Sequence, residues 1–157
     1  GATLDIGVQA DLWDGEPDVD AVCRMIFSPR DCRFHADAWP IVGSSRFSPF
    51  NSQNTFIVRR LVRAYFLLPG IGRMDDIWAG YYLQALTGCR VAYCQPSVVQ
   101  ERNAHDVHRD YLDERAGYEN TLAVLRAMTA DPESICQFLP PQAVAARELY
   151  RRSLLAP

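Results

Sequence analysis

The segment from Pro69 to Gly88 constrains the fold most, because it carries the start and stop signals of one helix. Pro69-Gly70 interrupts the pattern before it, and Asp75-Asp76 stands directly before an aromatic-rich run with helical spacing. Gly88 follows this run and favours a helix end. We therefore expect a helix over Ile77–Leu86 with one broad apolar face. That face consists of Ile77, Trp78, Tyr81, Tyr82, Ala85 and Leu86.

The rest of the chain predicts few strands and a helical C-terminal third. Strands are expected at 3–10, 54–58, 90–93 and 97–99, and helices at 59–68, 105–130, 132–139 and 142–155. Residues 13–20 are expected as an acidic loop, 21–27 as a short helix or a strand, and 28–49 as a long irregular stretch. Strand and helix do not alternate regularly, so we predict an α/β (α+β) fold. It would have a small mixed sheet covered by helices, in a single domain over 1–157.

Composition excludes several classes of protein. Apolar residues make up 48% of the 157 residues and charged residues 22%, which is ordinary for a globular chain. The net charge of −3 gives no basic footprint for nucleic acid, and no apolar run has the length of a membrane span. The five cysteines are odd in number and form no Cys-x-x-Cys. Free thiols and a cytoplasmic location are therefore expected, without a zinc cluster.

The pair Asp75-Asp76 is the strongest candidate for a functional site. A carboxylate at a helix start can point into a pocket, where it grips or deprotonates a sugar hydroxyl, while Trp78 behind it can cover a sugar ring. Arg73 can bind phosphate or pair with either carboxylate. The alternative is structural, because acidic residues commonly cap helix N-termini and aromatic stripes commonly lie in the core.

Several segments resemble one family of sugar-nucleotide proteins. The string from Gly72 to Gly80 resembles the Gly-Arg-x-Asp-Asp-x-Trp-Ala-Gly motif of the reversibly glycosylated polypeptides, the plant UDP-arabinopyranose mutases, and also a segment of the STELLO glycosyltransferase-like proteins. Leu12-Trp13 followed by 17–21 is similar to a mutase segment, and 50–55 and 99–105 are similar to STELLO. The resemblance runs from Asp11 to His105. It implies the C-terminal, acceptor half of a GT-A fold, with the metal-binding N-terminal half supplied elsewhere.

The resemblance also implies roles for particular residues. Asp75 and Asp76 would be catalytic, one of them as a general base or as a stabiliser of an oxocarbenium-like transition state. Manganese or magnesium would accompany a nucleotide-sugar, with His105 or Gln100 as a candidate ligand; His108 lies three residues after His105. Asp18-Val19-Asp20 is an Asp-x-Asp string, but a polar, turn-rich run precedes it. The substrate-binding candidates are Trp13, Asp18, Asp20, Asn54, Arg73 and Trp78.

Two functions follow as expectations. The first is a glycosyltransferase-like domain that binds a sugar or nucleotide-sugar, as a transferase or mutase if it is active. The absence of a Gly-rich phosphate-binding loop in the sequence weighs against autonomous catalysis. The second is a non-catalytic interaction domain that covers its exposed sheet edge by forming a homodimer.

Overall fold

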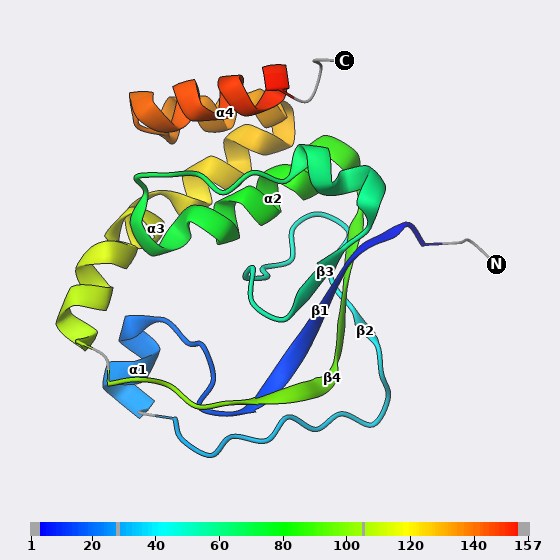
Figure 1. Ribbon diagram of the computed structural model, residues 1–157, viewed down its shortest axis with the longest axis vertical. Helices are drawn as coiled ribbons and strands as arrows, with labels where there is room; N and C mark the ends of the chain where they lie inside the picture. Colours follow the sequence, from blue (N-terminus) through cyan, green and yellow to red (C-terminus); the bar gives the residue numbers. More distant parts are fainter. Residues whose placement is uncertain (1–3, 28, 105, 154–157) are drawn as a thin grey trace.

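The computed structural model describes residues 4–27, 29–104 and 106–153, and it is a mixed α/β fold in three layers. A four-stranded sheet of order β2-β4-β1-β3 forms the first layer. Figure 1 shows helix α2 (Asp75–Thr87) between this sheet and helices α3 (Val107–Ala130) and α4 (Pro141–Ser153). The predicted fold class, a small mixed sheet covered by helices with a helical C-terminal third, is confirmed at this level.

The sheet is built around two long parallel strands, β1 (Ile6–Gly15) and β4 (Arg90–Gln100). Two short strands, β3 (Thr55–Ile57) and β2 (Ile41–Val42), pair antiparallel with β1 and β4 respectively. β4 was expected as two pieces around Pro96, but it is one strand. The register with β1 shifts where Pro96 lies, and this irregularity accommodates a residue that has no N–H to donate.

β1 is longer than the sequence predicts. Trp13, Asp14 and Gly15 pair with residues 98–100 of β4, so the prediction of a loop from residue 13 is wrong at its start. Pairing with a long neighbouring strand outweighs the polar composition of this stretch, because each paired residue satisfies its backbone N–H and C=O groups. As a result, a rigid strand ends only two residues before Pro17, directly upstream of the Asp18-Val19-Asp20 string.

Helix α2 confirms the predicted helix before Gly88, but its burial differs from the prediction. A 3-10 turn, η2 (Gly72–Met74), leads into it, and Gly88 ends it in the left-handed conformation at φ 69°. The prediction of a single apolar face is wrong, because the helix is buried on two sides. Leu83 packs against the sheet with Val8 and Val91. The opposite side packs against the C-terminal helices, through Trp78, Ala79, Tyr81 and Tyr82.

The remaining helices agree with the prediction in place and differ in type or length. Residues 21–27 form a short helix, α1 (Ala21–Phe27), and residues 59–64 form a 3-10 helix, η1 (Arg59–Ala64), shorter than expected. Another 3-10 helix, η3 (Pro132–Phe138), lies between α3 and α4. α3 begins after Asp106, whose side chain accepts a hydrogen bond from the Arg109 N–H.

Gly117 is a site of close packing within α3. A Cβ added there would lie 2.5 Å from the Sδ atom of Met74, so the missing side chain lets η2 approach the helix.

The five cysteines are free in this structure. No helix within residues 4–27, 29–104 and 106–153 combines the length and apolar character needed to cross a bilayer.

Candidate functional site

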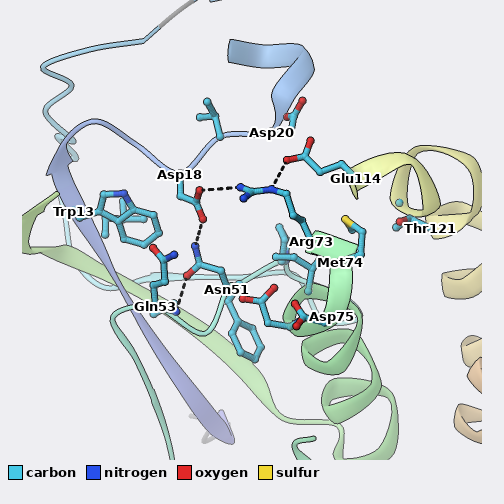
Figure 2. Close-up of a pocket in the computed structure, with 18 of the residues that line it drawn as sticks. Trp13, Asp18, Asp20, Asn51, Gln53, Arg73, Met74, Asp75, Glu114 and Thr121 are labelled. Carbon is cyan, nitrogen blue, oxygen red and sulfur yellow. Dashed lines mark hydrogen bonds and ion pairs between the residues drawn. The ribbon is translucent and has the colours of Figure 1, made fainter. Parts of the chain in front are cut away.

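A pocket of about 570 Å³ opens where the sheet meets the N-terminal ends of α1 and α2 and one side of α3. Its volume falls within the range of roughly 300–1,000 Å³ that is typical of small-molecule sites. Figure 2 shows its polar side chains converging from β1, the loop before α1, the loop before β3, η2, α2 and α3. Segments far apart in the sequence therefore form one site.

The structure brings six of the predicted site residues into this pocket. They are Trp13, Asp18, Asp20, Arg73, Asp75 and Asp76. Two others, Asn54 and Trp78, do not line it. His105, the candidate metal ligand, lies outside the described residues.

Trp78 and Asn54 have structural positions. Trp78 is only 1% exposed, and its Nε1 donates a hydrogen bond of 2.9 Å to the hydroxyl of Thr121, which itself lines the pocket. The Asn54 side-chain amide donates to the Leu12 carbonyl at 3.2 Å and to the Ser97 hydroxyl at 2.9 Å. Neither side chain therefore stacks on or grips a ligand directly; one supports the pocket wall and the other joins β1 to β4.

The two carboxylates at the start of α2 have different environments. The helix N-cap is Met74, but both aspartates lie in the first turn of α2, where carboxylates favour the helix N-terminus, so their positions also fit the structural alternative. The Asp76 carboxylate accepts two hydrogen bonds from Ser52, at 2.7 Å from its N–H and 3.0 Å from its hydroxyl. The Asp75 Oδ1 accepts a local hydrogen bond, from the Asp76 N–H at 2.8 Å. Asp76 thus fixes the neighbouring loop, whereas Asp75 is the carboxylate suited to a ligand.

Burial sets the protonation behaviour of Asp75. Desolvation raises the pKa of its carboxyl above the ordinary aspartate value, and the nearby charge of Asp76 acts in the same direction, while Arg73 opposes both. A carboxylate with a raised pKa is a stronger proton acceptor once it is ionised, which suits a general base.

Arg73 contacts three carboxylates, one from the loop before α1 and two from α3. Its Nε donates to Glu114 at 2.9 Å, and its two terminal nitrogens lie 3.6 Å from Asp18 and Asp110. Figure 2 shows the chain of polar contacts that runs from Asn51 through Asp18 and Arg73 to Glu114. The guanidinium therefore holds the wall together through all three of its nitrogens, and Arg73 lines the pocket.

Glu114 is the residue of this site that sequence reasoning missed. Its side chain is 6% exposed, and besides Arg73 it accepts from the Ala21 N–H at 2.7 Å and the Tyr118 hydroxyl at 2.6 Å. Burial and the bond to Glu114 both raise the Tyr118 pKa above its usual range. A signal was present in the sequence: Glu114 lies three residues after Tyr111 and four before Tyr118, so the three side chains share one face of the expected helix.

Asp18 and Asp20 have protein partners in this structure, unlike the metal-binding Asp-x-Asp of GT-A folds. Asp18 pairs with Arg102 and accepts from the Asn51 amide at 3.1 Å. Asp20 accepts from the Cys23 N–H at 3.0 Å and so caps α1. Among the residues that the structure describes, no three His, Cys, Asp or Glu side chains gather as a metal site would require. Asp18 and Asp20 are thus engaged with groups of the protein, and we derive no chemical step through a cation.

Known proteins add no family assignment. No protein-family model matches the chain, and no curated protein matches it.

Proposed function

We propose that this pocket binds a sugar through its hydroxyl groups, and that the chain is a glycosyltransferase-like domain related in fold to the acceptor half of GT-A proteins. The position of Asp75 carries the proposal. Its partly desolvated carboxylate faces a pocket of about 570 Å³ beside an indole, Trp13, and two amide side chains, Asn51 and Gln53. Carboxylates and amides pair with hydroxyls, and an aromatic face covers the apolar side of a sugar ring.

The charge of the lining favours a neutral ligand. Six carboxylates line the pocket, from Asp11, Asp18, Asp20, Asp75, Asp76 and Glu114, against the single guanidinium of Arg73. A phosphate placed among them would meet a strong repulsion at this low local dielectric. Uncharged hydroxyls meet none, and each can donate to a carboxylate oxygen. The sugar part of a sugar-nucleotide therefore fits here better than its diphosphate.

The same geometry supports a transferase step. As the oxygen of an acceptor hydroxyl forms its new bond to the anomeric carbon, its proton passes to the Asp75 carboxylate, and the leaving group departs with the electrons of the old bond. Asp76 and Glu114 keep Asp75 and Arg73 in place through their bonds to Ser52 and to α1. Asp75 acts as the general base in this proposal, and Asp76 as a positioning residue.

A second function, a non-catalytic interaction domain, is favoured by exposed apolar side chains away from the pocket. Met25, Ile26 and Phe27 at the end of α1 are 55–73% exposed, and Phe56 on the edge strand β3 is 61% exposed. Unpaired strand edges and apolar patches are common features of interfaces. This reading predicts a concentration-dependent dimer and no sugar binding.

Calorimetric titration tests the proposal. Neutral monosaccharides, and UDP- and GDP-sugars with and without manganese, are titrated into the protein and into the Asp75→Asn variant. Asp37→Asn, an exposed aspartate outside the pocket, is the matched control. We expect binding of at least one sugar, lost in the Asp75 variant and kept in the control. Equal affinity of both variants, or a dimer that binds no sugar, contradicts the proposal.

A further inference from the structure

We infer that a second pocket, on the other side of the Asp18–Arg102 ion pair, binds a phosphate group. Among the described residues that line this cavity of about 380 Å³ are three arginines, Arg24, Arg30 and Arg102, together with Asn103 and one carboxylate, Glu16. Guanidinium groups bind phosphate oxygens in bidentate pairs, and an amide adds a neutral donor. The class of ligand is a phosphate dianion.

The charge of this cavity is opposite to that of the sugar pocket. Counting the described lining residues, three arginines and one glutamate give it a formal charge of +2, with Arg102 also paired to Asp18, whereas six carboxylates and one arginine give the sugar pocket −5. The net charge of the whole chain is −3, so a concentration of positive charge in one cavity is not a consequence of composition. Low-dielectric walls strengthen the attraction of such a cavity for an anion.

Two of the arginines are held in place by the protein. The Arg102 side chain is only 7% exposed and pairs with Asp18, and the Arg24 Nη2 donates to the Pro17 carbonyl at 2.9 Å. Their guanidinium positions are therefore fixed before an anion arrives, which lowers the entropic cost of binding.

Arg30 is exposed, and within the described residues no hydrogen bond or ion pair of its side chain is present. It supplies a charge at the mouth of the cavity that has no structural role in the described part of the chain.

The two pockets share a wall. The segment from Glu16 to Asp20 separates them, since Glu16 lines the basic cavity and Asp18 lines the sugar pocket, and Arg102 touches Asp18 from the basic side. The phosphate therefore has two sources. It is free inorganic phosphate, or the phosphoryl group of a phosphorylated sugar whose ring lies in the sugar pocket. Only the second source rests on the proposed sugar-binding function.

The test is a titration of the full chain with inorganic phosphate, a neutral hexose and a hexose 1-phosphate, at two salt concentrations. Arg30→Gln removes one cavity charge. Arg33→Gln removes an exposed arginine three residues away that lines neither pocket, and it is the matched control. We expect phosphate affinity to fall about tenfold in the first variant, as for loss of one charge-assisted hydrogen bond, to stay unchanged in the second, and to weaken with added salt.

The Asp75→Asn variant then distinguishes the sources. Tighter binding of hexose 1-phosphate than of phosphate, weakened by both Asp75→Asn and Arg30→Gln, identifies a phosphorylated sugar. Equal binding of the two, weakened by Arg30→Gln alone, supports the phosphate site with free phosphate as its ligand and counts against the sugar pocket. No binding of either at about 10 mM, a range that reports even affinities weaker than millimolar, overturns the phosphate site. An equal effect of Arg30→Gln and Arg33→Gln also overturns it.

Discussion

Replacing Glu114 by glutamine should loosen the pocket wall and destabilise the whole chain. The substitution keeps the shape of the side chain but removes its charge and one acceptor oxygen. Three donors meet this carboxylate, from Arg73, Ala21 and Tyr118, at 2.6–2.9 Å. The amide of a glutamine points at least one N–H toward a donor, so one buried bond is lost and one charge loses its closest partner.

The magnitude follows from the surroundings of Arg73. Breaking a buried ion pair by removing one partner costs about 3–5 kcal/mol. Arg73 is about one-third exposed and keeps carboxylates of Asp18 and Asp110 at 3.6 Å, so the cost lies at or below the lower end of that range, at about 2–3 kcal/mol. In a chain of this size, 1 kcal/mol shifts the melting temperature by roughly 2–4 °C. A decrease of about 5–10 °C is therefore expected.

Urea denaturation and calorimetric melting measure this loss. Glu119→Gln, on the same helix, is the control, because Glu119 is 61% exposed and its pairing with Arg115 at 3.7 Å is a surface contact worth less than about 1 kcal/mol. A Glu114→Gln variant within about 0.5 kcal/mol of wild type, the range of an ordinary surface substitution, would refute the claim that this carboxylate holds the site together.

The remaining predictions concern Asp75 and one glycine. The folded-state pKa of Asp75 is raised, so its ionisation opposes folding. The free energy of unfolding therefore falls as the pH rises from the unfolded-state pKa, about 3.9, through the folded-state pKa. Asp75→Asn should then be at least as stable as wild type at pH 7, while it loses sugar affinity. Denaturant titration at pH 3 and pH 7 checks this, and a destabilised variant at pH 7 contradicts it. Gly72→Ala should cost several kcal/mol more than Gly88→Ala in the same assay. Both glycines have positive φ. A Cβ added at Gly72 would lie 2.0 Å from the Asp113 carbonyl oxygen, whereas one added at Gly88 would meet nothing within 4 Å. Equal losses of stability in the two variants would show that the contact with Asp113 does not constrain η2.

Local signals made part of the fold predictable from the sequence. Helix α2 was identified because Asp75-Asp76 and Gly88 bound an apolar run of helical spacing, and Gly88 does adopt the left-handed conformation. The second buried side of this helix was not predicted. A helix that packs between two layers is apolar on both sides, and only the tertiary structure shows that the sheet covers one side and the C-terminal helices cover the other.

The features that the sequence did not predict depend on strand pairing and contacts between residues far apart in the chain. The extension of β1 to Gly15 depends on β4, more than eighty residues later. Glu114 reaches α1 across 93 residues; its spacing from Tyr111 and Tyr118 indicates a shared helix face, but it does not indicate the contact with α1. Conversely, Trp78 follows the carboxylates in sequence but points into the core, since successive helical residues lie on different sides.

The most direct test of the sugar-binding claim is a titration followed through the indole N–H signals of the three tryptophans in a ¹⁵N NMR spectrum. Trp13 lines the pocket, Trp78 lies behind its wall on Thr121, and Trp39 lies away from it. With a bound monosaccharide or sugar-nucleotide, the Trp13 signal should shift most, Trp78 less and Trp39 not at all, and Asp75→Asn should abolish the shifts. A largest shift at Trp39, or no shift of Trp13 at saturating ligand, would contradict the assignment of this pocket as a sugar site.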